Sequence, residues 1–200
     1  MDTITNQGTI VAGLTGPGGT WGTAIQFGGA NNTLNLLAGS NIVGSLLFDA
    51  GATATIAARN AGLTLDNEVI LTDAASGVAF STATTGMTMS GRITGAGSLT
   101  IVGAGTLTMS GANTFTGTTT VGGGTLALVG GGSLAASSGV VVNSVLDVSG
   151  VTAGASIQAL SGAGTVRLGA RSLALTNAAG AFDGVIEGAG ESASAPAPRR

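Results

Sequence analysis

The feature that most constrains this chain is a short internal repeat in its apolar residues. Triplets of the form apolar-x-apolar recur along most of the sequence, and two series of them share one period of about 20 residues. The first series, which Leu46 and Leu65 extend upstream, consists of Met87, Leu107, Leu126, Leu146, Val166 and Ile186. The second series consists of Ile101, Val121, Val142 and Leu160. A unit of about 20 residues is too small to bury its own apolar face, so neighbouring units must stack to form a core.

The composition narrows the fold class to all-β. Gly accounts for 37 of the 200 residues but shows no three-residue period, which excludes collagen. Hydrophobic residues make up 44% and charged residues only 8%, the reverse of a disordered chain. Helix caps that lead into apolar stripes of helical period are missing. We therefore expect strands joined by turns.

Strand and corner residues follow one another within each unit. Segments such as 106–109 (TLTM) and 125–128 (TLAL) carry apolar residues at every second position, so one face of each strand points inward. Glycine runs at 122–124 and 130–132 supply corners, because positive φ costs glycine little. We predict a right-handed parallel β-helix (β-solenoid) with rungs of about 20 residues, in which roughly eight to ten rungs span roughly 40–48 Å. A β-sandwich is the alternative, but of the two-residue hairpin signals only Asp183-Gly184 is present.

Residues 103–128, GAGTLTMSGANTFTGTTTVGGGTLAL, resemble the passenger-associated transport repeat of bacterial autotransporters. Met109 stands where that family usually has Leu or Val. The positions that match the family's pattern are Gly103, Gly105, Leu107, Ser110, Gly111, Asn113, Thr114, Phe115, Gly117, Thr119, Val121, Gly124 and Leu126. The segment 156–190 is similar to the rungs that follow such a repeat, and the start of the chain is similar to N-terminal passenger rungs. The resemblance therefore covers about residues 4–190.

The resemblance implies a domain organisation and a route of secretion. It implies a β-helical passenger-like domain over residues 1–190. Residues 191–200, ESASAPAPRR, depart from the family pattern, and their polar, proline-containing composition predicts a disordered tail. Members of this family use type V secretion: an outer-membrane β-barrel translocator brings the passenger to the surface of a Gram-negative bacterium, and the repeat aids export and folding. Neither a signal peptide nor a barrel is recognisable in this sequence. We therefore expect either a fragment or a truncated reading frame, and we expect the translocator partner to belong to the full-length protein.

Few residues could carry catalysis. The chain has no His and no Cys, which excludes Ser-His-Asp and Cys-His constellations and the usual zinc sites. Asp66 and Glu68 have the spacing of a glycosidase carboxylate pair on one strand face, and Asp183 and Glu187 are the other closely spaced acids. Solvated surface charge explains both pairs more simply. The cations that a carbohydrate-cleaving groove needs are scattered along the rungs: Arg92, Arg167 and Arg171. We expect no catalytic, cofactor-binding or metal-binding residue.

A tryptophan and a threonine run are the remaining candidates for ligand contact. Trp21, the sole Trp, could stack on a ligand, but we expect it to pack in the core or the terminal rung. The run Thr118–Thr120 suggests an ice-matching array. Such an array needs Thr-x-Thr on every rung, and segments 145–148 (VLDV) and 165–168 (TVRL) break it, so we expect an ordinary β-branched surface. A net charge of −3 and the absence of Tyr leave no footprint for nucleic acid.

Three classes of function stay open. We expect a structural or adhesive, non-catalytic scaffold that meets host or bacterial surface ligands. A polysaccharide-active β-helix enzyme and a self-associating module are the alternatives. Self-association is expected at the C-terminal rung around Phe182, Val185 and Ile186, because Pro196 and Pro198 in the tail cannot extend a strand ladder.

Overall fold

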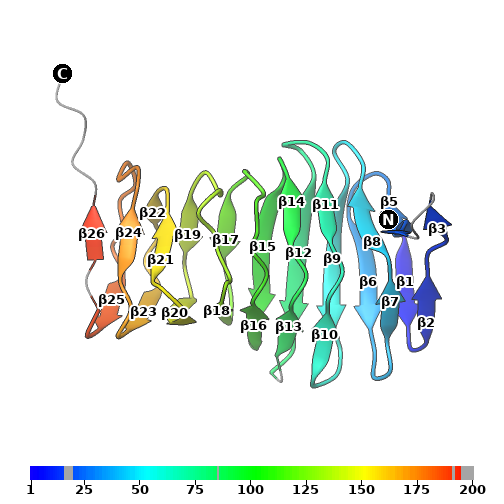
Figure 1. Ribbon diagram of the computed structural model, residues 1–200, viewed down its shortest axis with the longest axis horizontal. Coiled ribbons are helices and arrows are strands. Elements are labelled where there is room, and N and C mark those ends of the chain that lie inside the picture. Colours follow the sequence, from blue (N-terminus) through cyan, green and yellow to red (C-terminus); the bar gives the residue numbers. More distant parts are fainter. Residues whose placement is uncertain (16–19, 85, 191, 195–200) are drawn as a thin grey trace.

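The computed structural model describes residues 1–15, 20–84, 86–190 and 192–194. The strands lie across the long axis of the molecule and stack along it, with the N-terminal turns at one end and the C-terminal turns at the other (Figure 1). They make about 8 turns of about 21 residues, which confirms the predicted all-β solenoid. The described residues contain no helix, and so none that is long and apolar enough to cross a membrane.

The first side of the solenoid is the largest sheet, with eight parallel strands. Their order is β1 (Thr3–Asn6), β6 (Asn32–Leu36), β9 (Thr53–Ala58), β12 (Gly77–Thr82), β15 (Ser98–Gly103), β17 (Thr119–Val121), β19 (Val140–Val142) and β22 (Leu160–Ser161). Ile101 pairs with Val121, and Val121 pairs with Val142, as the second apolar series predicts. Leu160 pairs with Val140 instead of Val142, so its expected place in that series is wrong by two residues.

The second side is a parallel sheet of seven strands. Their order is β10 (Leu63–Leu65), β13 (Met87–Met89), β16 (Thr106–Met109), β18 (Thr125–Gly130), β20 (Val145–Val151), β23 (Thr165–Gly169) and β25 (Val185–Gly188). The first apolar series from Met87 to Ile186 forms one stacked row across it. The row is buried as far as Val166, whereas Ile186 on the last strand is 38% exposed. The upstream extension is wrong, since Leu65 pairs with Met89 and Leu46 lies in another sheet.

The third side is assembled from shorter sheets. Near the N-terminus it consists of β5 (Thr23–Phe27), β8 (Ser45–Phe48), β11 (Val69–Leu71) and β14 (Ile93–Gly95). Towards the C-terminus it consists of β21 (Ala155–Ile157), β24 (Leu173–Leu175) and β26 (Ser192–Ser194). Two small pairs complete the N-terminal end: β2 (Thr9–Val11) with β7 (Asn41–Val43), and β3 (Leu14–Thr15) with β4 (Thr20–Trp21). Among the paired strands described, only β3 and β4 are antiparallel. All the other pairs are parallel, and this pairing is incompatible with a β-sandwich built from hairpins.

The C-terminal tail differs in part from the expectation that the ladder ends at Gly190. Ser192–Ser194 form β26, which pairs in parallel with β24 and adds a strand to the third side. These residues have no proline, and their backbone groups are therefore free to join the ladder. Residues 195–200, which include both prolines of the expected disordered tail, lie outside the described residues.

The interior is one apolar column that runs from Ile25 to Leu173. Its members come from all three sides, and the rings of Phe27 and Phe48 on adjacent turns have centroids 4.7 Å apart. Burying one such side chain is worth about 1.5–3 kcal/mol relative to leaving it exposed. Because each turn contacts only its neighbours, stability accumulates turn by turn along the stack.

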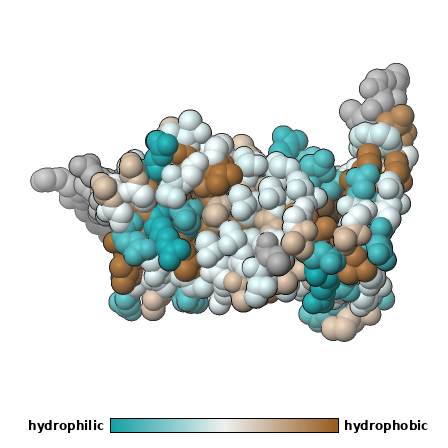
Figure 2. All heavy atoms as spheres, turned by 90° about the horizontal axis from the view of Figure 1, so that it is seen from below, coloured by the Kyte–Doolittle hydropathy of each residue, from teal (hydrophilic) through white to brown (hydrophobic). Residues whose placement is uncertain are grey.

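The outer surface is polar or neutral except at the two ends. Figure 2 shows mostly white atoms over the middle of the visible face, the colour of near-neutral residues such as Gly, Ser and Thr. Among the described residues, the large apolar side chains that stay exposed lie near the termini: Met1, Ile4, Val11, Leu14, Trp21, Val185 and Ile186. The stack therefore closes its core laterally but presents apolar groups at its ends.

One corner of the stack is held by an aspartate. Oδ1 of Asp73, between β11 and β12, accepts hydrogen bonds from the backbone N–H groups of Ser76 at 2.7 Å and Ala75 at 3.1 Å. It also accepts one at 3.1 Å from Gly51 on the preceding turn. The bond from Gly51 and those from the corner itself lower the pKa of the Asp73 carboxyl, because all of them favour its charged form.

Candidate functional site

The segment that resembles the transport repeat forms one full turn of the solenoid and the start of the next. It runs from β15 through β16 and β17 into β18. Leu107 on β16 pairs with Leu126 on β18, so the two ends of the segment lie on top of each other. Phe115, between β16 and β17, is 1% exposed and packs in the column on the third side, where the segment has no strand.

The glycines of the segment lie where one turn touches the turn before it. A Cβ atom on Gly117 would collide with the backbone carbonyl oxygen of Gly97. A Cβ atom on Gly111 would collide in the same way with the carbonyl of Gly91. A side chain at either position would push two turns apart, which explains why this pattern needs glycine there.

Asn113 ties three successive turns together. Its side chain is 4% exposed, and its Oδ1 accepts a hydrogen bond from the backbone N–H of Ile93 at 2.9 Å. Its Nδ2 donates to the carbonyl of Gly111 in its own turn at 3.0 Å and to that of Ser133 in the next turn at 3.1 Å. The sequence identifies Asn113 only as a position of the repeat motif. Its structural role is not visible there, because two of its hydrogen-bond partners lie a full turn away along the chain, one before it and one after it.

We expect Asn113→Asp to destabilise the chain by about 2–4 kcal/mol. The substitution keeps the shape but replaces a donor by an acceptor that faces two carbonyl oxygens, in a buried place. Urea unfolding followed by circular dichroism measures the change. Asn177→Asp, at an exposed asparagine, is the matched control and should change the free energy of unfolding by less than about 0.5 kcal/mol. Equal effects of the two substitutions would contradict the role of Asn113.

The structure does not bring Asp66 and Glu68 together as a facing pair. They occupy the corner between β10 and β11, on either side of the buried Asn67. Oε1 of Glu68 accepts a hydrogen bond from Nε of Arg92 on the next turn at 3.0 Å, and the two form an ion pair. The sequence suggested that Arg92 lies apart from the acidic residues. The structure places it beside Glu68, because the corner of one turn lies next to the corner of the following turn.

Asp183 and Glu187 are also separated from each other. Glu187 lies on β25, and its carboxylate forms an ion pair with Arg167 on β23, with Nε and Oε1 2.9 Å apart. Asp147 on β20 is the neighbour of Arg167 in the strand register on the other side, so acid, base and acid follow one another along one outer row. Arg171 donates to the carbonyl of Thr152 at 3.1 Å. Such exposed pairs add little stability and fit a solvated surface.

Metal-ligating side chains do not gather in the part of the chain that the structure describes. No group of three or more Asp or Glu residues there could hold a metal ion.

The threonine run spans two faces of one strand. Thr119 points inward, and its hydroxyl lies 3.0 Å from that of Ser137, while Thr118 and Thr120 face outward. The segments expected to break an ice-matching array, VLDV and TVRL, lie in β20 and β23 on another side. On the side that carries the run, the outer row that holds Thr120 is Thr3, Thr33, Thr55, Ala79, Thr100, Thr120, Val141 and Ser161. Ala79 and Val141 interrupt the hydroxyl groups of this row.

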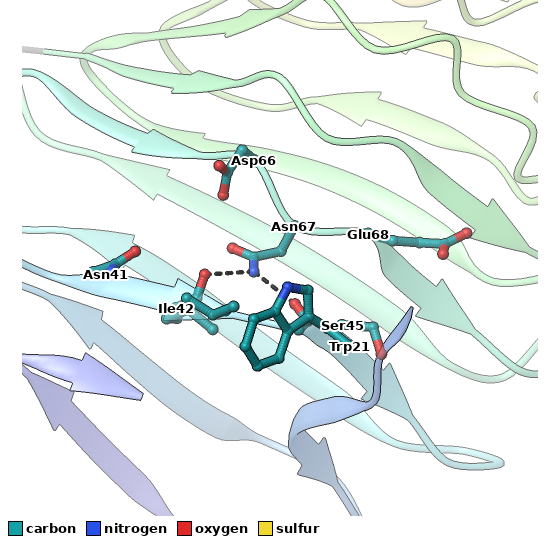
Figure 3. A pocket seen from close by; sticks show the side chains of 9 residues that line it. Trp21, Asn41, Ile42, Ser45, Asp66, Asn67 and Glu68 are labelled. Carbon is teal, nitrogen blue, oxygen red and sulfur yellow. Dashed lines mark hydrogen bonds between the residues drawn. The ribbon is translucent and has the colours of Figure 1, made fainter. Parts of the chain in front are cut away.

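Of the two places expected for Trp21, the core and the terminal rung, the structure excludes the core and places the residue, half exposed, at the N-terminal end. It lies on β4 of the antiparallel pair at the N-terminal end, and its side chain is 51% exposed. It lines a hollow together with the corner that holds Asp66, Asn67 and Glu68 (Figure 3). Sequence reasoning missed this groove, although the glycine- and proline-rich stretch just before Trp21 is typical of a turn outside a regular stack.

Comparison with known families bears out the resemblance seen in the sequence. Residues 99–128 match the model of the passenger-associated-transport-repeat family. The match begins four residues before the expected start at Gly103 and ends at the expected residue, Leu128. A search of curated proteins gave no match, and neither did a search of solved structures. The repeat and the β-solenoid together are consistent with an autotransporter passenger scaffold.

Proposed function

We propose that this chain, a parallel β-solenoid that carries a passenger-associated transport repeat, is a non-catalytic adhesive scaffold. It acts on the bacterial surface or after release from it, and it reaches that place through an outer-membrane β-barrel translocator in the full-length protein. Its outer faces meet host or bacterial ligands, while the repeat assists export and folding.

The observation that carries the proposal is the match at residues 99–128, which form a complete turn within an uninterrupted stack. A turn held by close glycine contacts and by Asn113 forms a firm nucleus on which neighbouring turns can add. Folding that starts at one turn and propagates would favour passage of the chain in one direction. The repeat can therefore aid export without any reactive side chain.

The outer side chains support a role in contact with ligands more than a role in catalysis. An outer row rich in small polar residues runs along the first side, and charges alternate on β20, β23 and β25 of the second. The carboxylate of Glu68, one of the candidate acids, is already held by Arg92. A glycosidase needs two carboxyl groups that face the same bond.

Export of the repeat-deleted chain tests the proposal. The chain is placed between a signal peptide and the translocator of an autotransporter in a Gram-negative host, and surface display is measured by protease accessibility on intact cells. Deletion of residues 106–124 removes one turn in register, because Thr106 pairs with Thr125. Deletion of residues 145–164 removes another turn in register and is the matched control, because Val145 pairs with Thr165.

We expect the first deletion to lower surface display several-fold more than the second. Equal display of both deletions would contradict a special role of the repeat in export. Failure of the intact chain to reach the surface would contradict the proposed function as a whole.

A further inference from the structure

The N-terminal end of the solenoid has a groove that the scaffold function does not explain. It is a hollow of about 370 Å³, within the range of about 300–1,000 Å³ typical of small-molecule sites. Polar residues line it together with the apolar Ile42 and Val43 and with Gly44; the polar and aromatic members are Trp21, Asn41, Ser45, Asp66, Asn67 and Glu68. Figure 3 shows Asp66 and Glu68 extending in different directions from the corner, with the indole of Trp21 beside Ile42 and Asn67.

The groove is built by close packing of the β3–β4 pair against the corner between β7 and β8. The backbone N–H of Ser45 donates to the carbonyl of Gly22, the residue after Trp21, at 3.0 Å. Gly44 has a φ of 123°, and a Cβ atom there would lie 2.6 Å from the carbonyl oxygen of Gly22. Only glycine fits at this position, so the backbone next to Trp21 lies directly against this corner.

The floor of the groove is polar and incompletely satisfied. Nδ2 of Asn67 donates to the carbonyls of Ile42 at 2.8 Å and Gly44 at 2.6 Å. Its Oδ1 is buried and has no hydrogen-bond partner, although the side chain is only 6% exposed. Buried acceptors without a donor are rare in folded proteins. That atom is closed to solvent, whereas the side chains of Asn41 and Asp66 in the same groove are exposed.

We propose that this groove binds a glycan, with one pyranose ring stacked on Trp21. The C–H face of a pyranose is apolar and weakly positive at its hydrogens, which suits the electron-rich face of an exposed indole. The hydroxyl groups at the ring edge then meet the exposed Asp66 carboxylate and the Asn41 amide. In small-molecule sites, a small number of placed polar groups fix the orientation of a ligand that lies on apolar or aromatic side chains, here Trp21, Ile42 and Val43.

A neutral sugar fits this charge pattern better than an organic cation. Binding of a quaternary ammonium uses several aromatic faces, and among the residues that the structure describes only Trp21 brings an aromatic ring to the groove. Arg92 neutralises Glu68, one of the two carboxylates there. The remaining carboxylate, that of Asp66, suits acceptance of hydroxyl hydrogens.

This binding deepens the adhesive part of the proposed function and rests on it for its biological role, but it is measured without export. Because Trp21 is the sole Trp, the emission of the purified chain reports on this groove alone. Binding to a broad glycan array is measured first, to identify which glycans the chain binds. Chitotetraose, cellotetraose and tetramethylammonium chloride are then titrated separately while the Trp21 emission is recorded. We expect a saturable shift of the emission with at least one pyranose oligosaccharide and none with tetramethylammonium.

Variants locate the binding by calorimetry, which does not depend on fluorescence. We expect Trp21→Ala to weaken glycan binding about tenfold or more and Trp21→Phe to retain most of it. Asp66→Ala should weaken binding several-fold, while Val185→Ala, at an exposed apolar residue of the opposite end, should leave it unchanged.

No binding on the glycan array would overturn the proposal, as would binding that survives Trp21→Ala. A shift with tetramethylammonium alone would replace it by an organic-cation site. Each of these results would leave the scaffold and its export as they were, since those are tested by surface display.

Discussion

Replacing Leu126 by aspartate is expected to unfold several turns of the solenoid. Leu126 is fully buried in the row between Leu107 and Leu146. A carboxylate there has no partner and no water, so the substitution costs about 4–5 kcal/mol or more. That approaches the whole stability of a typical domain, about 5–15 kcal/mol. Because turns support each other only through neighbours, the loss spreads along the stack.

Far-ultraviolet circular dichroism and thermal melting measure this effect. Thr108→Asp is the matched control, since Thr108 lies on the adjacent strand of the same sheet but faces outward. We expect the control to keep its β-sheet spectrum and to melt within a few degrees of the parent chain. A Leu126→Asp chain with the same spectrum and melting point would show that the row is not the core.

The stacked rows could be predicted because the repeat keeps one period where the turns are regular. From Met87 onward, the turns are nearly equal in length, and the members of each apolar series pair as expected, except Leu160, which pairs with Val140. Towards the N-terminus the turns are longer. Leu34 pairs with Ile56 and Ile56 pairs with Phe80, and both of these steps exceed the one from Leu107 to Leu126.

Leu46 shows why spacing alone fails in that region. It precedes Leu65 by one period, as the series requires, but it pairs with Val69 on the third side. All three sides carry apolar-x-apolar triplets, so a triplet on one side can match the period of another by coincidence. Only the register of the strands decides between them, and corner length sets that register.

The groove was less predictable than the repeat. The repeat could be identified from residues 103–128 alone, because its glycines and Asn113 have their structural roles within a regular stack of turns. The exposure of Trp21 depends on an antiparallel pair that leaves the stack, and two-residue periodicity contains no sign of it. Likewise, the spacing of Asp66 and Glu68 suggests one strand face, whereas a corner separates them.

The isolated chain is expected to associate end to end, more strongly at higher concentration. At the C-terminal end, β25 pairs with β23 on one edge, and the described residues supply no strand for its other edge. Val185 is 58% exposed and Ile186 38% exposed on that strand. At the opposite end, Val11 is 55% exposed and Leu14 60%. Apolar side chains beside unpaired backbone groups form a template for another chain.

Contact between unlike ends determines what kind of assembly results. Joining the C-terminal end of one molecule to the N-terminal end of the next is heterologous, and it leaves a free end of each kind. The products should therefore be open linear oligomers of increasing length.

Sedimentation velocity across a concentration series measures this association as a sedimentation coefficient that rises continuously with concentration. A double variant, Val185→Lys with Ile186→Lys, should suppress the rise of the sedimentation coefficient. Its two charges would have to be buried at the contact between molecules. Thr108→Lys, in the middle of the stack, should not suppress it. A single monomeric species of the parent chain at every concentration would show that its exposed ends do not bind each other.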